Sequence, residues 1–122
     1  SGMFADTTAR EIKGLENFNT KNVTTMSEMF SRSNITTLDL SSFDTSNVTK
    51  MNNMFYRASS LTKIYASSKF ITDNVTNSRM MFTNATKLVG GNGTAYNASY
   101  VDKTYARIDK SGTPGYFTLK SS

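Results

Sequence analysis

Apolar and aromatic residues recur along the chain at intervals of about 25 residues. Each interval carries the same three anchors in the same order: a phenylalanine, an Asn-Val-Thr triplet and a Met-Phe pair. The anchors are Phe18, Phe43 and Phe70, then Asn22-Val23-Thr24, Asn47-Val48-Thr49 and Asn74-Val75-Thr76, then Met29-Phe30, Met54-Phe55 and Met81-Phe82. Met3-Phe4 begins 26 residues before the first of these pairs. A fixed period of this length is the sequence signature of a repeat architecture.

Within each repeat the spacing of apolar residues changes. In the second repeat, Leu38 and Leu40 alternate with polar residues over 37–41, which predicts a short half-buried strand. The next apolar residues fall at i, i+3, i+6 and i+7, which predicts one face of a short helix. They are Val23, Met26, Met29 and Phe30 in the first repeat, and Val48, Met51, Met54 and Phe55 in the second. We therefore expect an α/β solenoid, a leucine-rich-repeat-like stack of short strand plus short helix units.

The methionine and phenylalanine residues of these units are expected to form the core rather than a ligand-binding surface. They occupy the positions that face inward in every repeat, and methionine fills irregular gaps between packed elements. Aligning the repeats matches Leu15, Leu40 and Ile64. The alignment then places Gly14, Asp39 and Lys63 in one outward column, and Glu16, Ser41 and Tyr65 in the next. This arrangement predicts an ion pair between Asp39 and Lys63.

The last third of the chain breaks the period. Gly90-Gly91-Asn92-Gly93 predicts a turn, because glycine and asparagine favour turn conformations. Two alternating segments, 104–109 and 116–120, flank a turn-rich stretch, which predicts a C-terminal β-hairpin that caps the last repeat. Three parts are expected: 1–2 as the scar of tag cleavage, 3–89 as a partial first unit plus three units, and 90–122 as the cap with its hairpin.

The composition argues against an enzyme. The chain has no cysteine and no histidine, which removes thiolate chemistry, the commonest general base and the commonest metal ligand. The nine acidic residues could supply a glycosidase pair, but the expected columns place no two of them side by side. We therefore expect no catalytic residues, no metal site and no cofactor.

The net charge is +5, and the charged residues are scattered along the chain. This pattern favours an ordinary solvated basic surface, with affinity for an anionic polymer such as sulfated glycan, teichoic acid or nucleic acid as the alternative. No nucleic-acid-binding motif is present, so no nucleic-acid partner is expected. No stretch reaches the roughly 18 apolar residues of a membrane span, so no membrane insertion is expected. The Asn-x-Thr/Ser sequences match glycosylation acceptors. Three of them are the repeated Asn-Val-Thr anchor, which favours a structural reason, and in a protist source they would be candidate glycosylation sites.

The sequence of the second repeat, 38–55, resembles the repeat of the BspA-like leucine-rich-repeat bacterial surface proteins, also described as the bacterial surface protein 26-residue repeat family. Residues 14–20 are similar to a variant of that repeat. The segments 88–94, 103–109 and 114–118 look like the terminal part of the same family. The resemblance implies a secreted or wall-attached bacterial protein that adheres to host proteins and cells, and it implies no catalytic residues.

Two functions are carried forward. The first is a binding or adhesion module that recognises a host extracellular-matrix or cell-surface protein or glycan through the solenoid face. Its candidate ligand-binding residues are Glu16, Thr37, Asp39, Ser41, Lys63 and Tyr65. Tyr65 is the best anchor, because its ring is apolar and its tip is polar. The second is a non-binding structural spacer or terminal cap of a larger surface protein. With either function, the protein is expected at the bacterial cell surface or outside the cell. This fragment is expected to be a monomer.

Overall fold

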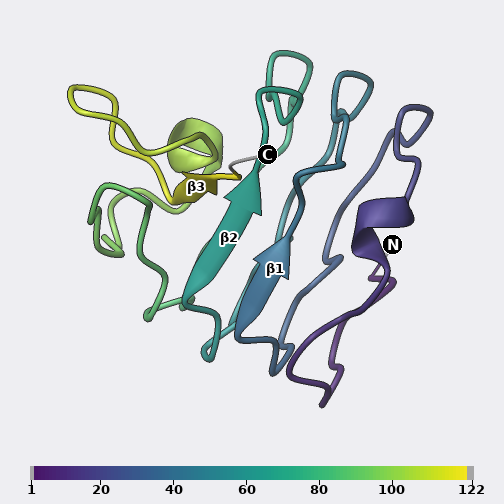
Figure 1. Cartoon of the computed structure of the whole chain (residues 1–122), viewed down its shortest axis with the longest axis horizontal. Helices are drawn as coiled ribbons and strands as arrows, with labels where there is room; N and C mark the ends of the chain where they lie inside the picture. The colour runs from purple at the N-terminus through teal and green to yellow at the C-terminus, as the bar shows by residue number, and fades with distance from the viewer. Residues whose placement is uncertain (1, 121–122) are drawn as a thin grey trace.

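The computed structural model describes residues 2–120, which form one small parallel sheet and many turns. The strands are β1 (Thr37–Asp39), β2 (Lys63–Ala66) and β3 (Phe117–Leu119), and the 3-10 helices are η1 (Leu15–Asn17) and η2 (Lys103–Tyr105). The strands lie in the order β1-β2-β3 (Figure 1). Ser1, half of the expected tag scar, and residues 121–122 at the end of the expected cap lie outside the described residues.

The predicted solenoid of strand plus helix units is wrong. No α-helix occurs within residues 2–120, and the Met-Phe segments of the repeats are runs of turns. The cause is two residues of positive φ in each segment, because such residues end a right-handed helix. They are Glu28 (φ +60°) and Arg32 (+55°), Asn53 (+58°) and Arg57 (+55°), and Met80 (+57°) and Asn84 (+65°).

Neighbouring copies of the repeat are joined by the backbone of alternate residues. The amides of Met51, Asn53, Phe55 and Arg57 donate to the carbonyls of Asn77, Arg79, Met81 and Thr83, at 2.8, 3.0, 2.8 and 2.8 Å. The intervening amides of Met54 and Tyr56 donate to the residue three positions earlier in their own copy. A helix would need bonds to the fourth residue back. The copies therefore lie side by side as successive loops (Figure 1).

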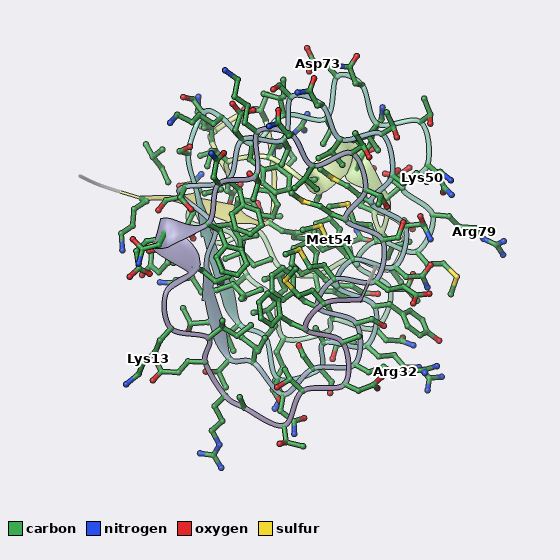
Figure 2. The ribbon with its side chains drawn as sticks, turned by 90° about the vertical axis from the view of Figure 1, so that its right-hand side faces the viewer. Lys13, Arg32, Lys50, Met54, Asp73 and Arg79 are labelled. Atoms are coloured by element: carbon green, nitrogen blue, oxygen red, sulfur yellow. The ribbon has the colours of Figure 1, made fainter. Side chains whose placement is uncertain are left out.

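The prediction that methionine and phenylalanine form the core is confirmed for the Met-Phe pairs of the three full copies, whereas Met3 is 69% exposed. Met51, Met54 and Phe55 are completely buried, and Met54 lies at the centre of the molecule in Figure 2. Four rings, one from each copy, stack in a column that we call the phenylalanine ladder: Phe4, Phe30, Phe55 and Phe82. Successive centroids lie 5.6, 5.7 and 5.2 Å apart, with interplanar angles of 7–8°. The ring of Tyr116 meets Phe82 edge-on at 4.9 Å and ends the ladder.

The repeated Asn-Val-Thr anchor also joins neighbouring copies. The side-chain amide of Asn47 donates to the carbonyl of Lys21, and that of Asn74 donates to the carbonyl of Ser46, each at 2.7 Å. Val48, between the polar members of the triplet, is completely buried. The asparagine nitrogen that a glycan would occupy is therefore already a structural hydrogen-bond donor in these two copies.

The predicted β-hairpin is wrong as well. The expected strand over 104–109 begins within η2, and β3 pairs in parallel with β2 rather than with this segment in antiparallel. Ile108 does form an isolated bridge with Phe117, but that bridge is parallel. The amide of Val89 donates to the carbonyl of Thr62 at 3.0 Å, so Val89 lies beside the start of β2, where a further strand would begin. The chain turns away from this place directly afterwards. β3 later takes the place beside β2, as Figure 1 shows.

The predicted turn at 90–93 is confirmed, and a buried carboxylate holds it against the end of the chain. Asp109 accepts hydrogen bonds from the amides of Asn92 (2.8 Å), Thr94 (3.0 Å) and Gly115 (3.1 Å), and from the Thr94 hydroxyl (2.7 Å). A Cβ on Gly90 would lie 2.1 Å from the Gly115 carbonyl oxygen, so only glycine fits there. Burial raises the pKa of Asp109, but these hydrogen bonds outweigh burial and hold the pKa below its ordinary value.

We predict that Glu28→Gly keeps the free energy of unfolding or raises it by up to about 1 kcal/mol, because glycine adopts a positive φ without strain. In a helix interior the same change would cost about 1 kcal/mol. Urea unfolding measures the difference. Lys50→Gly, at an exposed position outside the positive-φ sites, is the control and should destabilise. A loss in Glu28→Gly as large as in Lys50→Gly would contradict the turn structure.

We also predict that Asp109→Asn lowers the free energy of unfolding at pH 7 by about 1–3 kcal/mol, because an amide cannot accept all four hydrogen bonds. The folded pKa of Asp109 is lowered, so its contribution is complete above the unfolded value of 3.8 and is lost as the pH falls through the folded pKa. The gap between variant and wild type should therefore narrow toward about pH 2. Asp73→Asn, at an exposed carboxylate, should show no such gap at pH 7. A gap that is independent of pH would refute the role of the charge.

Candidate binding face

The outer face of the sheet carries the polar residues of β1 and β2. Leu38 and Ile64 point inward and are buried, and the residues on either side of them are exposed or half-buried. The register pairs Leu38 with Ile64, Thr37 with Lys63, and Asp39 with Tyr65. The two predicted columns are therefore wrong by two residues, since Lys63 lies beside Thr37 rather than Asp39, and Tyr65 beside Asp39 rather than Ser41. The predicted match of Leu40 with Ile64 is wrong in the same way, because Leu38 pairs with Ile64. The interval between paired strands is 26 residues, in keeping with the longer third repeat.

Asp39 forms an ion pair with a residue that the sequence did not suggest. Its Oδ2 lies 3.1 Å from Nζ of Lys120, which directly follows β3, so the predicted pair with Lys63 is wrong. Ser41 donates its amide to Asp39 Oδ1 at 3.0 Å, and its hydroxyl donates to the same oxygen. Burial raises the pKa of Asp39, but the bonds from Ser41 and the charge of Lys120 outweigh it and hold the pKa below its ordinary value.

Two lysine side chains lie close to the ring of Tyr65. Nζ of Lys120 is 5.0 Å from the centroid of its ring, and Nζ of Lys63 is 5.6 Å from it. Both distances are within the range of cation–π attraction. We call Asp39, Lys63, Tyr65 and Lys120 the Tyr65 patch. The patch is a half-buried aromatic ring beside two lysines and one aspartate, so its net charge is positive.

The structure gathers most of the predicted site residues but not all of them. Thr37 is the cross-strand neighbour of Lys63, and Ser41 is bound to Asp39. Glu16 lies on η1, and among the described residues no hydrogen bond or ion pair joins it to the patch. Lys120 was missed because 116–120 was assigned to a hairpin. Its place depends on how β3 returns to the sheet, which no sequence pattern indicates.

β3 sets the boundary of the patch on its other side. Thr118 is the cross-strand neighbour of Tyr65, and its hydroxyl is buried without a hydrogen-bond partner among the described residues. A Cβ on Gly91 would lie 3.2 Å from that hydroxyl oxygen, so the turn approaches β3 closely over Thr118. The accessible part of the face is therefore centred on β2 rather than on β3.

A cavity of about 210 Å³ lies at the opposite end, beside the first copy of the repeat. Its lining includes Phe18, Val23 and Met3, and the counterparts of the first two in the next copy, Phe43 and Val48, are completely buried. A preceding copy of the repeat would cover the same side chains. The lining carries no acidic or basic side chain, so the cavity lacks the groups that acid–base chemistry needs.

We searched the part of the chain that the structure describes for metal-binding groups and for membrane-spanning helices. Residues 2–120 contain no group of three or more acidic, histidine or cysteine side chains placed to bind a metal ion. None of the helices within the same residues has the length and hydrophobicity to span a bilayer.

Comparison with known proteins identifies a family. A family model described as "Mycoplasma protein of unknown function, DUF285" matches residues 1–113. No curated protein and no solved structure matches the chain. The family match covers most of the sequence and includes every copy of the repeat. The chain therefore belongs to the DUF285 family, in agreement with the expected bacterial surface repeat protein.

Proposed function

We propose that this chain is a non-catalytic recognition module that binds a host protein or glycan through the Tyr65 patch. The observation that carries the proposal is the position of Tyr65, half-buried on an outward strand face close to two lysines. The proposal includes a place at the bacterial surface or outside the cell. It also includes the narrower kinship with BspA-like proteins, which the sequence resemblance alone supports.

The surroundings of Tyr65 favour binding because they restrict its ring before a ligand arrives. Lys120 is tethered to Asp39, and Lys63 is on the same strand as Tyr65, so the groups that contact the ring are already placed. Less conformational entropy is then lost on binding. A tyrosine also offers an apolar surface and a hydroxyl together, which suits both a peptide side chain and a sugar ring.

A structural spacer is the second candidate, and the cavity beside the first copy favours it. Phe18 and Val23 line this cavity, and their counterparts in the next copy, Phe43 and Val48, are buried. Such a lining suits the addition of further copies of the repeat, because each copy contacts only its neighbours. In that case the outer face of the sheet would be an ordinary solvated surface.

Binding of the whole chain to an array of extracellular-matrix proteins and glycans tests the first proposal. Tyr65→Ala should weaken the binding of the ligand by about tenfold or more, as expected for an aromatic anchor. Lys120→Ala should weaken it less, because the lysine acts partly by holding the ring. Tyr100→Ala is the matched control, since Tyr100 is 39% exposed and its ring stacks on Tyr105 of η2 rather than on a residue of the Tyr65 patch.

Thermal unfolding of each variant checks that the fold is retained. Equal losses of binding in Tyr65→Ala and Tyr100→Ala would contradict a site at the Tyr65 patch. Failure of the wild-type chain to bind any protein or glycan of the array would reject the recognition module and leave the spacer.

A further inference from the structure

Two arginines from neighbouring copies share one aromatic ring on another part of the surface. Cζ of Arg32 lies 5.6 Å from the centroid of Tyr56, and Cζ of Arg57 lies 5.3 Å from it. The backbone fixes this meeting, because the amide of Arg32 donates to the carbonyl of Tyr56 at 2.7 Å across the junction between copies. Both arginines are exposed and Tyr56 is half-buried. We call Arg32, Tyr56 and Arg57 the arginine pair site.

The backbone at these positions does not favour arginine. Arg32 and Arg57 both have φ of +55°, and the corresponding residues are Asp6 (φ +60°) in the partial N-terminal copy and Asn84 (φ +65°) in the third full copy. Aspartate and asparagine are the residues other than glycine that adopt this conformation most readily. The first two full copies therefore carry a less suitable residue at this position.

The two guanidinium groups are also unpaired. Within residues 2–120, no carboxylate lies within 4.0 Å of either group, and no side-chain hydrogen bond engages them. Asp6 and Glu28 are the acidic residues of the adjoining turns, and neither forms a salt bridge with Arg32. Two like charges on one ring repel each other, and each guanidinium keeps its donors free.

The site belongs to a basic edge that is separate from the Tyr65 patch. Figure 2 shows Arg32, Lys50 and Arg79 projecting from the side of the molecule away from the strands. Lys50 comes just before the turns of the copy that carries Tyr56 and Arg57, and Arg79 lies in the turns of the next copy. Among the described residues, neither of them forms a salt bridge. The positive potential of this edge would attract an anion toward the pair.

We propose that Arg32 and Arg57, held against Tyr56, bind a tetrahedral oxyanion, the sulfate or phosphate ester group of an anionic polymer. Planar guanidinium forks match the oxygens of such a group, so each arginine offers it a bidentate contact. A sulfated glycan and a phosphate polymer present the same chemistry. The ring orients both side chains, so the site depends on arginine geometry and not on charge alone.

Calorimetric titration of the whole chain at low salt tests the site with two probes, a heparin-derived oligosaccharide for sulfate esters and inorganic polyphosphate for phosphate. At least one probe should bind, and the stronger one identifies the source of the oxyanion. Arg57→Gln should weaken binding by about tenfold, the effect of losing one charge-assisted bidentate contact. Arg57→Lys should weaken binding to a smaller extent, because it keeps the charge and loses the fork.

Arg10→Gln is the matched control, since it removes an exposed arginine outside the site and changes the net charge equally. It should weaken binding less than about twofold, as expected for screened long-range charge. Equal losses in Arg10→Gln and Arg57→Gln would overturn the proposal, because binding would then follow net charge alone. Failure of both probes to bind the wild-type chain would also overturn it.

Arg57→Asn separates binding from folding, because asparagine suits the φ of +55° at this position. This variant should lose binding while its unfolding temperature stays within about 3 °C of wild type. Tyr65→Ala should weaken the binding of either probe less than Arg57→Gln does, which keeps this proposal distinct from the Tyr65 patch. A loss of probe binding in Tyr65→Ala equal to that in Arg57→Gln would contradict a separate site.

Discussion

Each copy of the repeat donates alternate backbone amides to the next copy, and the rest of the structure depends on these hydrogen bonds. They set one residue of a copy beside its counterpart 25 to 27 positions later, as in Phe30 and Phe55. The phenylalanine ladder follows from this register, since rings at equivalent positions are brought to 5.2–5.7 Å from one another. Backbone and core therefore specify the same alignment, and each reinforces the other.

The same register produces both surface sites. On the strand side, it brings Asp39 beside Tyr65, and the return of β3 adds Lys120 to them. On the turn side, it brings Arg32 against Tyr56. In each case residues far apart in the sequence meet because the copies that carry them are neighbours. A repeat chain can in this way form composite sites while every copy keeps the same core.

The sequence predicts the period, the core and the short strands of this fold, because burial leaves a direct mark on the apolar pattern. It does not reveal the turns: a spacing of i, i+3 and i+7 arises both from a helix and from a run of turns. Only the φ angles at residues such as Glu28 and Asn53 separate the two. The partner of Asp39 was equally hidden, since it depends on how β3 returns to the sheet. Tyr65 was predictable because its place on an outward strand face follows from alternation.

Scalar couplings across hydrogen bonds, measured by NMR on the isotopically labelled chain, test the central claim most directly. They identify the donor and acceptor of each bond rather than infer them from stability. The structure predicts a coupling from the amide nitrogen of Phe55 to the carbonyl carbon of Met81, and one from Phe30 to Met54. Couplings from Phe55 to Met51, four residues earlier in its own copy, would show a helix and contradict the account.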